Sequence, residues 1–397
     1  MRFTIKQIGC GSERIGVITG LIKFPDVVIE TPTVALLTQG GSVVHLTAEV
    51  LSKVFPNTQL LWVPVSNSHH LEAGMKAQGE GVAKFAGLPQ HVTCVTMHNM
   101  SETTPTGHFE LNKVPLWTKH GKKMVTADRY MDLMEIYKPD IMLALSDGHT
   151  SLNEGLKRIH KAVDRTSNML NRCVDRYKAS LHLHNSALIG EFKFLAINVF
   201  EAVPKELLRI VEGCWNPAVV MSAIEHGWDV FDGSYPNKLS NAGLALVLNF
   251  DVNRQSKELC ILDLNDDRYS EDFTPMLAGC DCLACKKHTL FYYYLAIDDP
   301  LLSRASCTCM ESNKPSVPCW HGVLHNARSR ADWIQRLPAT FTRSSVHLGS
   351  QWSLSTLRWQ NQRCGIMLLM SQHYAEIGAF SDLVQSYYSF FLFFFYL

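Results

Sequence analysis

The sequence has no excess of charge of either sign. Its 397 residues include 37 Lys and Arg and 37 Asp and Glu, so the formal net charge is zero. A chain without a positive excess cannot hold nucleic acid by bulk electrostatics alone, and any contact of that kind must be local. Charged residues make up 19% of the chain and aromatic residues 10%, a balance that excludes wholesale disorder. The length allows one large domain or two medium ones.

Long apolar runs are also missing. No stretch reaches the roughly 20 apolar residues that cross a bilayer, and the nearest candidate is the aromatic run from Tyr387 to Leu397. Residues 1–8 lack the apolar core of a signal peptide. We therefore expect neither secretion nor a membrane span, and a reducing cytosolic compartment follows by default.

Cysteine is too scarce for a disulfide scaffold, but it is clustered. Eight of the 12 cysteines lie between Cys260 and Cys364. Clustering of this kind indicates a metal site rather than disulfide bonds. The densest group is Cys280, Cys282 and Cys285, three thiols that can converge on one zinc ion in a tetrahedral site.

Such a zinc site needs a fourth ligand. A histidine further along the chain is the usual completion, and His288, His321 and His325 are all candidates. No water-activating carboxylate accompanies the thiols, so a closed structural site is favoured over a catalytic one. The alternative is a set of reduced core cysteines without metal.

Helices and strands alternate along most of the chain. Up to about residue 100 the sequence predicts strands and turns, with strands at 27–29, 33–37 and 60–63. Further on we expect helices at 126–137, 151–178 and 217–227, strands at 141–145, 187–189 and 228–231, and a strand pair at 243–252 and 258–264. This alternation implies a parallel sheet, either a β/α barrel or a doubly wound fold. Residues 303–364 have weak periodicity and read as a poorly ordered tail or an irregular extension.

Two aspartates and two basic clusters are candidate functional residues. Asp147 and Asp232 each follow a short apolar strand, where a β/α barrel presents its active site, although a turn or helix-cap role explains them as well. The basic clusters could contact phosphates, and a solvated surface is the alternative. They are Lys119, His120, Lys122 and Lys123, and Lys157, Arg158, His160 and Lys161.

Several motifs together resemble the tRNA-guanine transglycosylase family. The most specific are Tyr269 to Pro275 and Gly279 to Thr289, the second of which contains the three thiols. Three further stretches fit the same family, at 37–47, 138–148 and 157–165. The resemblance covers most of residues 1–300. It implies a TIM-type (β/α)8 barrel with a zinc-binding insertion near its C-terminus, in a domain spanning 1–300, followed by a divergent region at 301–397.

The resemblance also implies a set of zinc ligands, and the chain departs from the family pattern in one segment. The family's fourth zinc ligand lies in a His-Asn pair, which His325 and Asn326 resemble, so the implied set is Cys280, Cys282, Cys285 and His325. Between Gly190 and Val211 the chain is shorter than the family by some tens of residues. The missing piece would include at least one barrel strand, which would expose a sheet edge or require an altered closure.

The resemblance implies a function in tRNA modification. The eukaryotic enzyme is a heterodimer of a catalytic and a non-catalytic subunit that exchanges guanine for queuine at the wobble position of tRNA. Asp232, in Phe231-Asp232, matches the family nucleophile, but the motif Asp-Ser-Gly-Gly-Phe-Gln is absent. The resemblance therefore implies a non-catalytic subunit that binds zinc, tRNA and the catalytic subunit. Its expected location is the cytoplasm or, peripherally, the mitochondrial outer membrane. The alternatives are an active transglycosylase using Asp232 and an inactive truncated isoform.

Overall fold

The computed structural model of the protein describes most of the first 300 residues and two short segments near the C-terminus. The described ranges are 1–9, 12–44, 46–105, 108, 110–118, 121–148, 156–195, 206–247, 260–278, 283–296, 365–369 and 390–396. The predicted ligands Cys280, Cys282 and His325 lie outside these ranges, as do His321 and most of the region 301–397.

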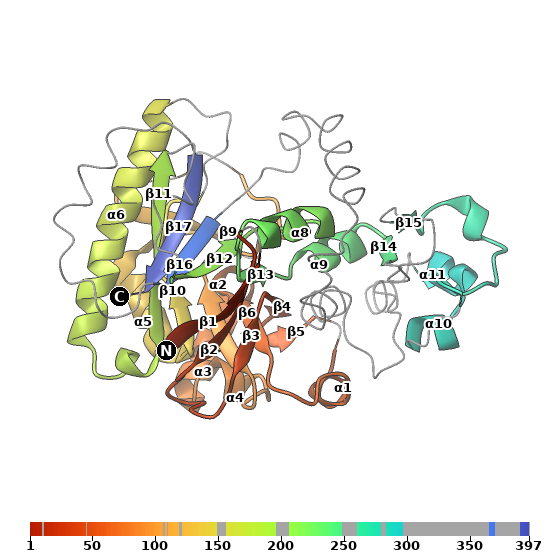
Figure 1. Cartoon of the computed structure of the whole chain (residues 1–397), viewed down its shortest axis with the longest axis horizontal. Coiled ribbons are helices and arrows are strands. Elements are labelled where there is room, and N and C mark those ends of the chain that lie inside the picture. Colours follow the sequence, from red (N-terminus) through yellow and green to blue (C-terminus); the bar gives the residue numbers. More distant parts are fainter. Residues whose placement is uncertain are drawn as a thin grey trace.

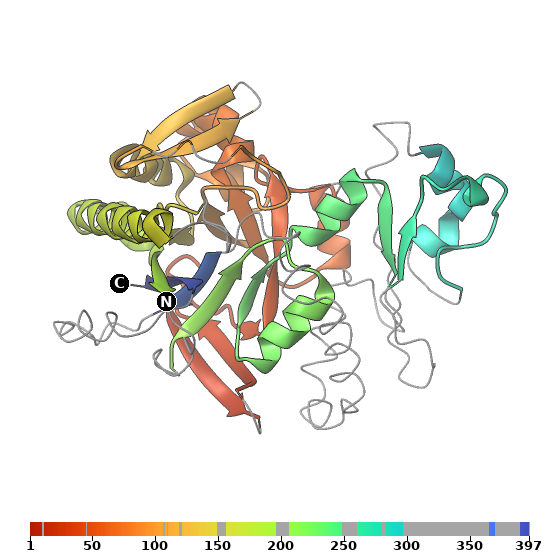
Figure 2. The ribbon, with the colours of Figure 1, turned by 90° about the horizontal axis from the view of Figure 1, so that it is seen from above.

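Parallel strands form the body of the largest sheet. Their bounds are β4 (Thr33–Gln39), β6 (Leu60–Pro64), β7 (Val92–Thr96), β10 (Ile141–Leu143), β11 (Ala187–Leu195), β12 (Leu208–Glu212) and β13 (Val230–Asp232). In space they follow the order β12, β13, β4, β6, β7, β10, β11. Because β13 returns to pair with β4, the first of the series, the sheet curls as in a TIM-like barrel (Figures 1 and 2). The predicted α/β class is confirmed, and the curl favours the barrel over the doubly wound alternative.

Helices cover the outer face of this sheet. Their bounds are α1 (Ala48–Val54), α2 (Val65–Ser68), α3 (Glu72–Gln78), α4 (Val82–Phe85), α5 (Ala127–Tyr137), α6 (Leu156–Ala179), α8 (Pro217–Glu225) and α9 (Tyr235–Asn241). Local sequence explains where the main ones begin. Thr126 accepts a hydrogen bond from the Arg129 N–H and caps α5, and Asn216 caps α8 in the same way through Val219. Pro217 then occupies the first turn of α8, where its missing N–H costs nothing.

The barrel strands are buried on both faces. Every residue of β6 and β7 is buried, which is the pattern of a parallel strand covered on each side. Alternate residues separate into two cores. In β6, Leu60 and Trp62 face the barrel lumen, while Leu61 and Val63 pack against the surrounding helices.

A three-stranded antiparallel sheet closes the end of the barrel where the strands begin. It consists of β1 (Arg2–Ile8), β2 (Arg14–Thr19) and β3 (Ile29–Thr31). Ile18 and Ile29 enter the same apolar cluster as the lumen residues of the barrel. Arg14 pairs with the buried carboxylate of Asp229 and donates a hydrogen bond to the Leu207 carbonyl at 2.5 Å. The N-terminal sheet is thereby fixed to the entrances of β12 and β13.

Two smaller structures extend from the barrel. β5 (Ser42–Val43) pairs with β4, and the hairpin of β8 (Lys113–Thr118) and β9 (Gly121–Thr126) precedes α5.

A separate unit lies at the opposite side from α6 (Figures 1 and 2). It contains β14 (Leu244–Val247), β15 (Cys260–Asp263), α10 (Leu283–Lys287) and α11 (Leu290–Ala296) around its own small apolar core. Its first two strands pair antiparallel, which confirms the predicted strand pair.

Two strands from the C-terminal region join the barrel sheet. β16 (Gly365–Leu369) pairs antiparallel with β12, and β17 (Phe390–Tyr396) pairs antiparallel with β11. The sequence suggested no regular structure for this region, so these strands are new. The predicted boundary at residue 300 stays a prediction, although two segments beyond it contribute to the sheet. Among the described residues, no helix is both long and apolar enough to cross a membrane.

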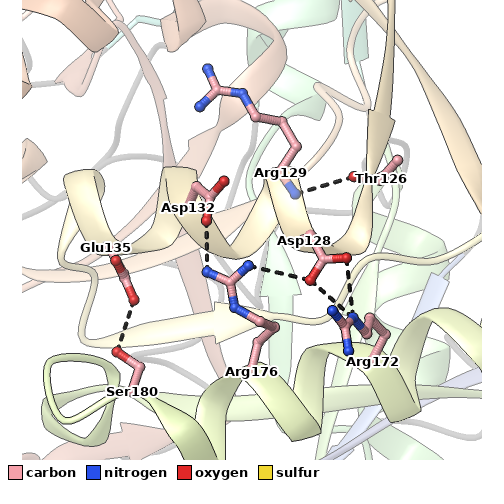
Figure 3. A network of polar contacts seen from close by, with 8 residues as sticks. All are labelled: Thr126, Asp128, Arg129, Asp132, Glu135, Arg172, Arg176 and Ser180. Carbon is pink, nitrogen blue, oxygen red and sulfur yellow. Dashed lines mark hydrogen bonds and ion pairs between the residues drawn. The ribbon is translucent and has the colours of Figure 1, made fainter.

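An ion-pair network joins α5 to α6 (Figure 3). Arg176 donates to Asp132 at 2.6 Å and to Asp128 at 3.2 Å, and Arg172 donates to Asp128 at 2.9 Å. One turn further on, the Ser180 hydroxyl donates to Glu135. These groups are partly exposed, so each pair contributes little alone, and the shared arginine makes them a network. The network fixes the second half of α6 against α5.

Most predicted elements are confirmed, with shifted ends. The helix at 126–137 and the strands at 33–37 and 60–63 are present. The strand predicted at 141–145 ends at Leu143, and the one at 27–29 begins only at Ile29. The prediction of strands and turns alone up to residue 100 is wrong, because α1 to α4 lie there. These helices are short, so their periodicity is difficult to detect in sequence.

The ion pair at the base of the barrel should be critical for stability. Burial raises the pKa of Asp229, and Arg14 opposes this rise, so removing Arg14 leaves a buried carboxylate without its cation. We expect Arg14→Leu to lower the free energy of unfolding by about 3–5 kcal/mol, measured by denaturant titration. The matched control is Arg129→Leu, which breaks a partly exposed pair with Glu72 and should cost about 1 kcal/mol or less. Equal losses in the two variants would contradict this prediction.

Candidate functional site

Polar side chains gather in the lumen at the carboxyl ends of the barrel strands. Thr96, Glu212 and Asp232 are the last residues of β7, β12 and β13. The residues two positions before them belong to the lumen cluster, and they are Cys94, Ile210 and Val230. Because side chains alternate along a strand, the three polar residues also face the lumen. They lie at the end of the barrel where TIM-barrel proteins place their active sites.

The two carboxyl groups lie on adjacent strands. Val211 pairs with Phe231 in register, which places Glu212 beside Asp232. Both carboxyl groups are buried, with residue exposures of 6% for Glu212 and 1% for Asp232. The Thr96 hydroxyl donates a hydrogen bond to Glu212, and the Ser234 N–H donates to Asp232 at 2.9 Å.

Glycine at position 233 allows this arrangement. A Cβ atom there would lie 2.3 Å from the Ala35 carbonyl oxygen, so any side chain would push the turn away from β4. The sequence analysis offered a turn as one role for Asp232. The pair Asp232-Gly233 is also a point of close packing against β4. It holds Asp232 at the end of β13, within the wall of the barrel.

Burial controls the ionisation of Asp232. It raises the pKa of this carboxyl group to about 7, although hydrogen bonds from Ser234 and Gly213 favour the charged form. At neutral pH about half of the Asp232 side chains are therefore protonated. A carboxyl nucleophile must be ionised to attack, and burial disfavours this form of Asp232.

The buried carboxylate of Asp147 pairs with two partly buried arginines. Arg158 donates to its two carboxylate oxygens at 2.6 and 2.8 Å, and Arg165 donates at 3.3 Å. The Asp147 N–H donates to the Thr166 hydroxyl at 3.1 Å. All three partners lie on α6, so Asp147 anchors this helix to the end of β10 rather than forming a simple turn. Its carboxylate is paired with two cations, Arg158 and Arg165.

The described part of the predicted zinc motif is small. Cys285 lies in α10, where it is half-buried and packs against the core of the small unit. His288 stacks on Tyr292 with ring centroids 4.2 Å apart. Among the residues that the structure describes, no group of three or more His, Cys, Asp or Glu side chains could hold a metal ion. Zinc binding by Cys280, Cys282, Cys285 and His325 therefore stays a prediction.

The sequence analysis identified part of this site. It singled out Asp232 and Asp147, and the structure places both at the carboxyl ends of barrel strands, although Asp147 is paired with arginines. It missed Glu212, whose signal is the short segment Leu208–Val211, apolar apart from Arg209, that the residue terminates. Arg158 was noted as a phosphate-binding candidate, whereas the structure uses it to neutralise Asp147. The described lysines of both basic clusters are exposed to solvent. They are Lys122, Lys123, Lys157 and Lys161.

Comparisons with known proteins define the class. A family model described as queuine tRNA-ribosyltransferase matches residues 10–193 and 191–297. This match covers the barrel and the cysteine motif and more than half of the chain. The chain belongs to this family, the tRNA-guanine transglycosylases, which confirms the resemblance read from its motifs.

Three curated relatives of this chain share the name of one member of the family. Proteins from Aedes aegypti and Anopheles gambiae are each 29% identical to this chain, over 340 and 343 residues. The aligned part is 74% of this chain in both cases, and 81% and 79% of the relatives. A protein from Drosophila virilis is likewise 29% identical over 342 residues. All three are named queuine tRNA-ribosyltransferase accessory subunit 2.

The raised pKa of Asp232 predicts a pH dependence of stability. Between its ordinary value of 3.8 and about 7, the folded protein retains a proton on Asp232 that the unfolded chain has lost. This contribution therefore lowers stability as the pH rises from about 4 to about 7, by at most about 4 kcal/mol. Asp232→Asn, which mimics the protonated acid, should match the wild type near pH 4 and exceed its free energy of unfolding at pH 8.

Denaturant titrations of both proteins at the two pH values measure this difference. Asp263→Asn is the control, since that carboxyl group is exposed and its pKa is lowered rather than raised. A constant difference between wild type and Asp232→Asn from pH 4 to pH 8 would disprove the ionisation argument.

Proposed function

We propose that this chain is the non-catalytic accessory subunit of a tRNA-guanine transglycosylase, the enzyme that exchanges guanine for queuine at the wobble position of tRNA. The observation that carries the proposal is the shared name of the relatives, over an alignment that covers about four fifths of their length. The state of the barrel mouth supports it independently, because burial disfavours the ionised form of Asp232 and Asp147 is paired with two arginines.

The chemistry of base exchange explains why this mouth is a poor catalyst. The reaction needs an ionised nucleophile to attack the ribose and a second group to handle the proton of the departing base. Asp232 is half protonated at neutral pH, and Asp147 is held by Arg158 and Arg165. The motif Asp-Ser-Gly-Gly-Phe-Gln is absent from the sequence. The barrel therefore acts as a scaffold, and the chemistry belongs to the partner.

The partners of this chain are the catalytic subunit, in a heterodimer, and tRNA. A chain of zero net charge contacts RNA through local groups, and exposed lysines on the β8–β9 hairpin and on α6 are available for this. Lys157 and Lys161 lie one turn apart and share a face of α6. The complex would be located in the cytoplasm and, peripherally, at the mitochondrial outer membrane.

The small unit would bind one zinc ion through Cys280, Cys282, Cys285 and His325. Three thiolates and one imidazole complete a tetrahedral shell, so the ion would be structural, with no open position for substrate. The half-buried Cys285 in α10, against the apolar core around Tyr293, supports this assignment. The metal would hold together a unit whose own apolar core is small.

Reconstitution tests the proposed role. Mixing this chain with the catalytic subunit should restore queuine incorporation into tRNA, whereas neither protein alone should incorporate it. Asp232→Asn in this chain should leave the activity of the pair within about twofold of wild type, because the group supplies no chemistry. The measurement is incorporation of labelled queuine or guanine, alongside co-purification of the two subunits.

Two results would overturn the proposal. Incorporation by this chain alone, lost in Asp232→Asn, would establish an active transglycosylase. A folded chain that neither co-purifies with the catalytic subunit nor restores activity would identify an inactive isoform.

Elemental analysis tests the zinc site. The purified chain should contain about one zinc ion, and Cys282→Ser should lose most of it and unfold more readily, because metal binding contributes to folding. Cys214→Ser is the control, since Cys214 lies outside the motif and burial raises the pKa of its thiol to about 11. Metal-free wild-type protein that unfolds cooperatively would refute the site.

A further inference from the structure

Among the strands that the structure describes, the parallel series is interrupted between β11 and β12. β11 and β12 follow one another along the chain, yet they do not pair, and each would be an edge of the curled sheet. Only residues 196–207 separate them, about the length of a single crossover and too short for a further strand with two helices. An open edge on each side would leave a row of backbone N–H and C=O groups unpaired.

C-terminal strands occupy this gap. β17 pairs with β11 along its whole length, from Ile189 opposite Tyr396 to Leu195 opposite Phe390. β16 pairs with β12 from Leu208 opposite Leu369 to Glu212 opposite Gly365. Both pairings are antiparallel, unlike those among the barrel strands, which are parallel.

The two inserted strands also lie against each other. β16 contacts β17, and it contacts β11 as well as its own partner β12. Both views of the molecule place the blue strands between β11 and β12 (Figures 1 and 2). The segment Phe390–Tyr396 has no polar side chain other than the terminal Tyr396 hydroxyl, and this pattern suits a strand covered on both faces.

We propose that the gap between β11 and β12 is a binding site for extended apolar strands, occupied by residues 390–396 and 365–369 of the same chain. These segments close the barrel in place of the absent parallel strand. The backbone N–H and C=O groups of β11 pair with those of β17 by β-augmentation. Such pairing accepts an antiparallel strand in a sheet whose other strands are parallel. This inference is independent of the role of the protein in tRNA modification.

Cysteine pairs test the register directly. Lys193 and Leu392 are opposite one another, so Lys193→Cys with Leu392→Cys places two thiols at a separation that a disulfide can bridge. In the control pair, Lys193→Cys with Phe391→Cys, the second thiol moves to the next residue and to the other face of the sheet. Both variants are oxidised in the folded full-length chain, and the cross-linked peptides are identified by mass spectrometry.

We expect at least tenfold more cross-link in the first pair than in the control, within monomers. Equal or absent cross-linking in the two pairs would overturn the proposal. Cross-linked dimers would overturn the intramolecular occupant, because the tail would then close the barrel of a second copy.

Hydrogen exchange provides a second measure that does not depend on added thiols. Phe393→Pro places a residue that strand interiors exclude in the middle of β17, opposite Phe192, and should raise the exchange rate of β11 amides between Ile189 and Leu195 at least tenfold. Phe393→Val keeps the backbone donor and strand propensity and should change these rates little. Unchanged β11 protection in a folded Phe393→Pro protein would contradict the proposal.

Discussion

The pairing of β13 with β4 is the constraint on which the rest of the structure depends. It brings the end of the parallel series back to its beginning, so that residues as distant in sequence as Thr33 and Val230 become neighbours. The buried pair of Arg14 and Asp229 reinforces this closure from below, since Asp229 immediately precedes β13. Without that return, Thr96, Glu212 and Asp232 would end separate strands of an open sheet and would not meet in one lumen.

The same closure also determines the chemical state of the acidic side chains at the barrel mouth. A lumen filled by Trp62, Cys94 and Leu143 excludes water below the carboxyl layer, and the resulting burial raises the pKa of Asp232 to about 7. Asp147 pairs with Arg158 and Arg165 of α6, so its carboxylate serves to pack this helix against the barrel. The two acidic residues thus differ in the fate of their charge, because burial disfavours it at Asp232 and ion pairing with α6 engages it at Asp147.

The sequence analysis correctly predicted those features of the protein that depend on short stretches of sequence. Thr126 identified the start of α5, the apolar runs identified most barrel strands, and the cysteine motif with its flanks identified the family. It did not reach Glu212, because an acidic residue at the end of a strand acquires meaning only when β12 lies beside β13. Nor could it pair Arg158 with Asp147, which lie 11 positions apart in the sequence. Both depend on contacts that form only after the barrel closes.

The C-terminal strands show why such closure tolerates unrelated sequence. A sheet edge is recognised mainly through backbone N–H and C=O groups, which every residue except proline supplies. The edge of β11 therefore demands an extended apolar segment of sufficient length, without demanding a direction or a particular sequence. Phe390–Tyr396 meets these conditions although it lies outside the part of the chain that the family model matches. The fold is thus specified by two separate rules, a precise one within the parallel strands and a permissive one at the gap between them.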